Sequence, residues 1–307
     1  MNNFYKYSLL FAVTMILVSD LLIPYNSFSQ EMEPRNYSSI PIHMNVAALT
    51  YLYSTGDVVS DATSPIQNLD LNSNTVGLGF LRSFGVFGKL CKIQISVPYT
   101  FLGGTAKLNG KDTSGSRSGF SDSKVKFVLN FIGTPALLPK DFVKFKEEFV
   151  LGTSLVIALP TGQYYDEKLI NLGSNRWGFK PEVGMSYNKG PFYFELFTGI
   201  WLFTSNNEFL KSKTLTQNPL FSMQVNLSYF FPSKIWIALN TTYVNGGETK
   251  VNGALQNNFQ KNFRGGLTLS VPVNMQNSFR LSASKGVYTR AGGDFTNISL
   301  TYQYIWF

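Results

Sequence analysis

The stretch CKIQISVPYTF, residues 91–101, alternates at every step between an apolar residue and a polar or small one. A period of two residues predicts a β-strand with one apolar face and one polar face. The same alternation returns along the chain as far as Phe307. In a soluble sandwich such an apolar face packs on a second sheet, whereas in an outer-membrane barrel it faces lipid and the polar face lines the lumen.

The spacing of apolar residues predicts about twelve such strands. Each is near the nine to eleven residues that a tilted strand needs to cross a bilayer, or slightly longer. We expect them at residues 42–53, 74–84, 89–101, 120–132, 147–159, 177–187, 192–203, 219–230, 235–244, 262–272, 278–286 and 295–306.

The connections between these strands alternate in length, and short turns on one side with long loops on the other are typical of outer-membrane barrels. The short connections are 85–88, 188–191, 231–234 and 273–277. The long ones are 54–73, 102–119, 160–176, 204–218 and 245–261. The connection 133–146 breaks this rule, because it falls on the short side and is long enough for a brief helix.

The composition favours a surface that meets lipid. Of the 307 residues, 15% are aromatic and only 14% are charged, whereas a soluble domain carries roughly a quarter charged residues. Large Phe, Tyr and Ile residues occupy the apolar face of nearly every strand, which argues against the alternative of a periplasmic sandwich. The predicted fold class is therefore all-β, a transmembrane antiparallel up-and-down β-barrel of about 12 strands.

The N-terminus reads as a signal peptide over residues 1–29, followed by a single barrel domain over 30–307. Lys6 is basic, Ser8–Val18 is an apolar run too short to span a membrane, and Ser27-Phe28-Ser29 fits a cleavage site. The alternative is an uncleaved anchor. The chain ends on aromatic Phe307 after an amphipathic last strand, which resembles the signal read by the bacterial barrel-assembly machinery. These features predict the outer membrane of a Gram-negative bacterium.

Several motifs resemble the family named "Putative MetA-pathway of phenol degradation", which consists of predicted outer-membrane transporters. The resemblance covers nearly all of the mature chain and implies a barrel fold and a link to aromatic catabolism. It assigns no functional residue. The motifs that carry it lie at residues 33–38 (EPRNYS), 118–122 (SGFSD), 160–164 (PTGQY), 171–177 (NLGSNRW), 179–182 (FKPE), 243–249 (YVNGGET) and 284–290 (SKGVYTR).

The polar faces of the strands give the candidate site. Alternation places eight charged side chains toward the lumen: Lys92, Lys124, Lys126, Lys180, Glu182, Glu195, Arg264 and Arg280. Their excess of basic groups would favour anionic solutes in an open pore. The alternative is that they neutralise one another, with Lys180 and Glu182 as neighbours on one face.

The residues favour passive uptake of a small solute, aromatic or anionic, and two other functions stay open. One is a structural or adhesive barrel with a closed lumen. The other is an esterase or phospholipase that uses His43, the only histidine, although no neighbouring residue completes a triad. No spacing indicates a metal site or a cofactor. Because the net charge of +8 is scattered, we expect lipid, lipopolysaccharide and a small solute as partners rather than nucleic acid.

Overall fold

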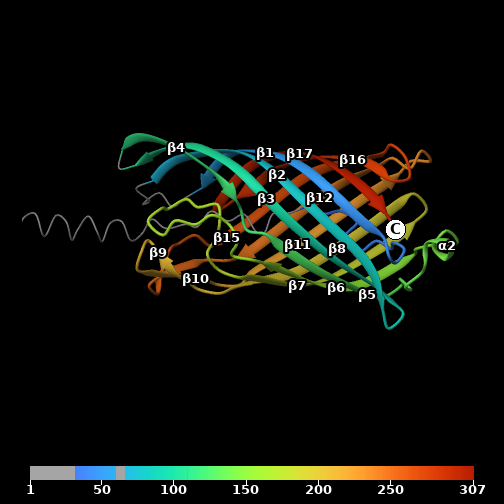
Figure 1. Cartoon of the computed structure of the whole chain (residues 1–307). Coiled ribbons are helices and arrows are strands. Elements are labelled where there is room, and N and C mark those ends of the chain that lie inside the picture. The colour runs from blue at the N-terminus through green and yellow to red at the C-terminus, as the bar shows by residue number, and fades with distance from the viewer. Residues whose placement is uncertain (1–31, 60–65, 109) are drawn as a thin grey trace, which may run out of the picture.

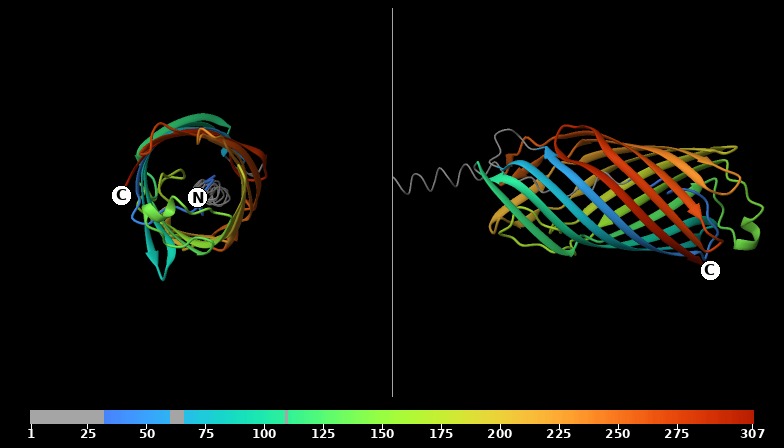
Figure 2. Two further views of the ribbon diagram at one scale, coloured as in Figure 1. Left: turned by 90° about the vertical axis from the view of Figure 1, so that its right-hand side faces the viewer. Right: turned by 90° about the horizontal axis from the view of Figure 1, so that it is seen from above.

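The computed structural model describes residues 32–59, 66–108 and 110–307. The predicted signal peptide lies outside the described residues. The chain forms a closed antiparallel β-barrel, whose strands wind around a common axis (Figure 1 and Figure 2). The predicted fold class is therefore confirmed.

Twelve strands make the wall, and each pairs antiparallel with the next strand of the wall, while β1 pairs with both β2 and β17 and so closes the ring. The strands are β1 (Asn45–Val59), β2 (Ile66–Val86), β3 (Lys89–Leu108), β5 (Lys124–Ile132), β6 (Phe149–Ala158), β7 (Gly178–Lys189), β8 (Phe192–Phe203), β11 (Leu220–Phe230), β12 (Trp236–Gly246), β15 (Gln260–Pro272), β16 (Asn277–Thr289) and β17 (Gly292–Trp306).

Two segments that we expected to be long loops are largely strand. In place of a loop over 54–73, β1 continues to Val59 and β2 begins at Ile66. In place of a loop over 102–119, β3 forms a hairpin with β4 (Lys111–Phe120), and this hairpin extends the wall at one end (Figure 1). Most of β4 is exposed on both faces. Such a strand carries no apolar alternation, because neither of its faces meets lipid or a core.

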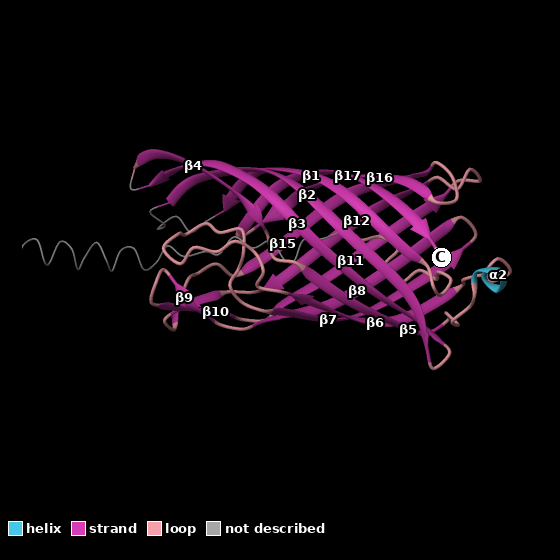
Figure 3. Ribbon diagram, viewed as in Figure 1, coloured by secondary structure: helices cyan, strands magenta, loops and turns pink. Residues whose placement is uncertain are grey.

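The two ends of the barrel differ, as the connection lengths predict. At the loop end, β9 (Asn206–Phe209), β10 (Lys213–Gln217), β13 (Thr249–Val251) and β14 (Ala254–Leu255) form a small second sheet. The opposite, turn end carries the short helix α2 (Pro139–Phe142) within the connection 133–146 (Figure 3). No helix in the described part of the chain is long and apolar enough to cross a membrane.

The outside of the wall is an apolar belt. On β3, Ile95 and Phe101 are exposed while Thr100 is buried, so successive side chains alternate between the outside and the interior. Aromatic rings gather at both margins of this belt, where Tyr99 contacts Phe101 and Phe120 toward the loop end and Tyr229 contacts Phe192 and Phe231 at the turn end. An apolar belt on a closed barrel, with aromatic side chains at its margin, places this protein in a bacterial outer membrane.

Candidate functional site

The lumen is partly filled by the segment that precedes β1, residues 32–44, which we call the plug. Looking along the barrel, Figure 2 (left) shows the start of the described chain, in blue, inside the ring of strands. The sulfur of Met32 lies against Gly266 of β15. The plug ends at the turn end, where Asn45 begins β1 opposite Trp306. Polar contacts between the plug and six wall strands, β2, β3, β5, β6, β7 and β8, define the candidate site.

Tyr37 anchors the plug in a socket on β6 and β7. Its side chain is 0% exposed, and its ring lies over Gly152 and Gly184, which pair across the two strands. A Cβ at Gly184 would fall 2.0 Å from the ring, so only glycine leaves room for it. The phenolic O–H donates a hydrogen bond to a carboxylate oxygen of Glu182 at 3.1 Å, and it is also 3.1 Å from the hydroxyl of Ser154.

The charged side chains predicted to line the lumen surround this plug. The Nζ of Lys126 is 2.8 Å from the Glu33 carboxylate and 4.0 Å from that of Glu182. Lys180 forms an ion pair with the same Glu182, at 3.0 Å. The buried ammonium of Lys92 donates to the carbonyls of two plug residues, Asn36 and Ser38, at 2.5 and 3.2 Å.

The middle of the plug is held by a buried carboxylate and by aromatic rings. The backbone N–H of Arg35 donates to Glu195, 2.7 Å away, and this carboxylate is 0% exposed. The guanidinium of Arg35 lies over the rings of Tyr193 and Phe230, with its central carbon 4.2 and 4.6 Å from their centroids. Such cation–π contacts stabilise a desolvated guanidinium by roughly 2 kcal/mol or more. On the other side, Asn130 donates to the carbonyl of Tyr37 at 2.7 Å.

The remaining predicted residues also lie in the interior. Arg264 donates to the Ser284 hydroxyl and the Phe295 carbonyl. Arg280 lies over the ring of Trp236, 5.3 Å from its centroid. Lys124 borders a cavity described below. Whether these side chains line a conducting passage stays a prediction.

Sequence reasoning missed the plug itself. The motif at residues 33–38 contributed to the family resemblance, but it received no role. The signal that could have revealed it is a charged and aromatic stretch, containing Glu33, Arg35 and Tyr37, directly before the first strand of a barrel whose lumen carries charges of both signs.

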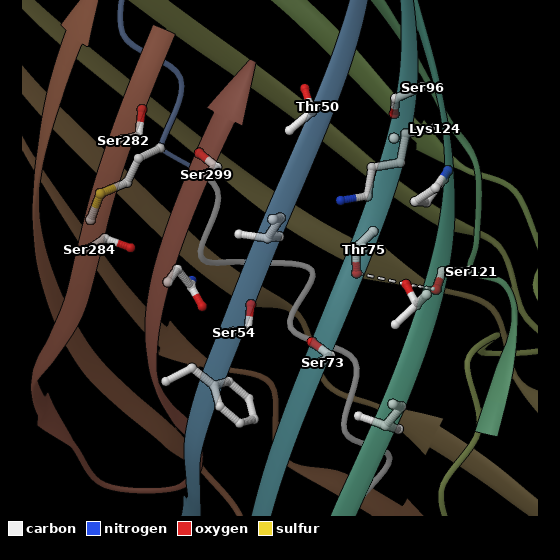
Figure 4. Close-up of a pocket in the computed structure, with 18 of the residues that line it drawn as sticks. Thr50, Ser54, Ser73, Thr75, Ser96, Ser121, Lys124, Ser282, Ser284 and Ser299 are labelled. Atoms are coloured by element: carbon white, nitrogen blue, oxygen red, sulfur yellow. Dashed lines mark hydrogen bonds between the residues drawn. The ribbon is translucent and has the colours of Figure 1, made fainter. Parts of the chain in front are cut away.

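A cavity of about 610 Å³ lies between the plug and the outer loops. Its lining includes plug residues Met32 and Glu33, the inner faces of β1, β2, β3, β15, β16 and β17, and residues 170–172 of the connection between β6 and β7. Figure 4 shows hydroxyl side chains from several strands pointing into this space, among them Ser54, Thr75, Ser96 and Ser299.

The connection 160–176, which covers one side of the cavity, is pinned to the wall by Asp122. This carboxylate accepts hydrogen bonds from the backbone of Gly162 at 2.9 Å and of Ser174 at 2.8 Å. Burial raises the pKa of Asp122, although these hydrogen bonds and the charge of Arg176 oppose the shift. Burial likewise lowers the pKa of Arg176, to about 10. Arg117 adds a second attachment, donating to the carbonyl of Ile170 at 2.7 Å.

The described residues bring no three metal-binding side chains together. A closed wall, an apolar belt and a polar lumen define the chain as an outer-membrane β-barrel. Sequence comparison then gives the family. The chain belongs to the family described as "Putative MetA-pathway of phenol degradation", whose model matches residues 53–301. This confirms the resemblance stated above. No curated protein matches the chain in sequence.

Solved structures share the fold. An outer membrane channel from Pseudomonas putida F1 is similar with a TM-score of 0.77 and 18% identity, over 90% of this chain and 100% of that one. The beta domain of the Bordetella autotransporter BrkA is similar with a TM-score of 0.53 and 11% identity, over 86% of this chain and 100% of that one. At these identities the likeness shows the barrel architecture alone.

Proposed function

We propose that this protein is a passive outer-membrane channel for a small polar solute, closed in this conformation by the plug. The observation that carries the proposal is that wall and plug are separate. Every wall strand has both of its neighbours without any contribution from residues 32–44. The plug can therefore leave the lumen without breaking a strand ladder, and the barrel would remain closed around an open passage.

The contacts of the plug support a reversible closure. Most polar contacts between plug residues 32–39 and the wall involve a side chain on at least one partner, as in the ion pair of Glu33 with Lys126. Water can replace such polar partners, so that the net contribution of each hydrogen bond is only about 1 kcal/mol. Solute movement would follow the concentration gradient.

The selectivity of the open channel follows from the same contacts. Lys126 and Lys92 would lose their partners on the plug, Glu33 and the two carbonyls, and would then face water. The lumen would become more basic, and we expect it to favour anions. The family description suggests an aromatic solute, and a solute panel that includes phenol tests this.

Two other functions have less support. A closed structural barrel would explain the many plug contacts, and it predicts that no current flows. An esterase would need an activated nucleophile. His43 is exposed at the turn end, and within the described residues no hydrogen bond to its imidazole is found. We therefore propose a channel and not an enzyme.

Conductance in planar lipid bilayers tests the proposal. The unmodified protein should show openings, and Arg35→Ala, which removes the contact with Tyr193 and Phe230, should lengthen them. Arg290→Ala is a matched control, because this arginine lies over the ring of Phe259 in the outer loops and not on the plug. If neither the unmodified barrel nor Arg35→Ala carries current, the structural barrel is the better explanation.

A further inference from the structure

The cavity above the plug differs chemically from the rest of the lumen. The plug lies among ion pairs, whereas the cavity wall is mostly hydroxyl and amide groups. This difference follows from strand alternation, which turns Ser54 of β1, Ser73 of β2 and Ser299 of β17 toward the same space (Figure 4).

The hydroxyl groups are held in place by short hydrogen-bonded chains. Thr100 is 2.9 Å from the Thr75 hydroxyl and also accepts from Ser121 at 2.9 Å (Figure 4). On the other side of the cavity, the amide of Asn240 donates to Thr268 at 2.8 Å. Groups that are fixed before a ligand arrives lose less entropy when it binds.

Two acceptors at this cavity lack a donor among the described residues. They are the side-chain oxygens of Asn240 and Asn297, both shielded from bulk solvent. Asn240 is 1% exposed. A buried acceptor without a partner costs roughly 1–3 kcal/mol. A ligand that carries several hydroxyl donors would satisfy both oxygens.

The charges at the cavity disfavour an anionic ligand. Three charged residues border it, namely the carboxylates of Glu33 and Asp122 and the ammonium of Lys124. A ligand carboxylate entering this space would be the third, and it would meet two like charges and one opposite charge. A neutral ligand avoids that repulsion.

Apolar side chains complete the lining. Leu71 and Leu102 border the cavity from neighbouring strands, with Phe295 from β17. Such groups can pack against the C–H face of a ring whose edge carries hydroxyls. A volume of about 610 Å³ falls within the range of about 300–1,000 Å³ that is typical of small-molecule sites.

We propose that this cavity binds a neutral, polyhydroxylated ring compound of the size of a mono- or disaccharide. The inference deepens the proposed channel function, since it names the class of solute that occupies the closed barrel. The ligand hydroxyls donate to Asn240 and Asn297, and they accept from and donate to the chain of Thr75, Thr100 and Ser121.

Saturation-transfer NMR on the full-length barrel in detergent micelles tests this with glucose, glucuronate and phenol. Glucose and glucuronate share a ring and differ by one carboxylate. Glucose should bind, and the affinity for glucuronate should be at least about tenfold lower. Asn240→Leu should weaken glucose binding about three- to tenfold, the effect of one neutral hydrogen bond. Thr241→Val is the matched control, because its side chain is absent from the cavity lining and glucose affinity should be unchanged.

Thr75→Val serves as a second variant if Asn240→Leu does not fold, as judged by heat-modifiable migration on a gel. It should weaken glucose binding to a similar extent. Three results would each overturn the inference: no glucose signal, equal binding of glucose and glucuronate, or phenol displacing glucose. The channel proposal stands apart from these results, because ion conductance is measured without any sugar.

Discussion

Replacing Gly184 with alanine should release the plug. The new methyl would lie 2.0 Å from a ring carbon of Tyr37, whereas ordinary contact begins near 3.4 Å. The ring is enclosed by Gly152 on the neighbouring strand and by Phe197, whose ring centroid is 5.0 Å away. It must therefore retreat by more than 1 Å, which also lengthens the contacts of its hydroxyl with Ser154 and Glu182.

The size of the effect follows from the cost of overpacking. An added methyl in a well-packed site costs about 1–3 kcal/mol. If the wall keeps its shape, this cost falls on the plugged state alone and shifts the ratio of unplugged to plugged barrels about 5- to 150-fold. We expect the wall to keep its shape, because a β-strand accommodates alanine and because the residue that pairs with position 184 across the two strands is the small Gly152.

Two measurements test the expected shift from plugged to unplugged barrels. In planar bilayers the open probability should rise, and in intact vesicles trypsin should cleave after Arg35 more rapidly. Gly265→Ala on β15 is the control, because its methyl would meet only Val287, at 3.6 Å. Wild-type gating in Gly184→Ala, or an equal change in Gly265→Ala, would refute the role assigned to the Tyr37 socket.

Three further predictions concern the wall. Ile95 is exposed to lipid, so Ile95→Arg should lower the free energy of unfolding by about 2–4 kcal/mol, measured by urea unfolding in lipid vesicles. Gln94→Arg on the inner face should lower it much less, and equal penalties would contradict the alternation. Under a salt gradient, the reversal potential of the open channel should show a preference for anions. This preference should weaken as the screening length falls from about 10 Å at 0.1 M to about 3 Å at 1 M salt, and replacing Lys124 and Lys126 with Glu should shift it toward cations. An unmodified protein that prefers cations would argue against the basic lumen. An epitope tag at Gly253, at the loop end, should be labelled on intact cells, whereas a tag at Lys189, at the turn end, should need a permeabilised membrane; the reverse pattern would invert the orientation.

The sequence predicted the wall of the barrel well, because lipid imposes a strict pattern on it. Each position that faces hydrocarbon must be apolar, and the period of two then fixes both the strand and the face. The predicted strands 177–187 and 219–230 therefore agree within two residues with β7 and β11. The sequence alone also placed Lys126, Glu182 and Glu195 on inward positions, where they are buried.

The same pattern fails where lipid is absent. The hairpin of β3 and β4 rises beyond the belt, where Ser, Thr and Gly meet water on both faces, so no alternation marked it as strand. The small sheet of β9, β10, β13 and β14 packs through Phe209, Leu215 and Val251 on Val58 and Leu71. The buried residues of this core come from three separate connections, and no local pattern reveals them.

Only the tertiary structure decided what fills the lumen. The alternation of residues predicts which side chains point inward, but it does not predict which residues those side chains contact. Glu33 and Lys126 are 93 positions apart, and Arg35 and Glu195 are 160 apart, so their contacts exist only once the ring has closed. The membrane imposes the alternation of apolar and polar residues along each strand, and this alternation determines the wall. The plug and the cavity depend instead on contacts between segments far apart in the sequence, about which the alternation carries no information.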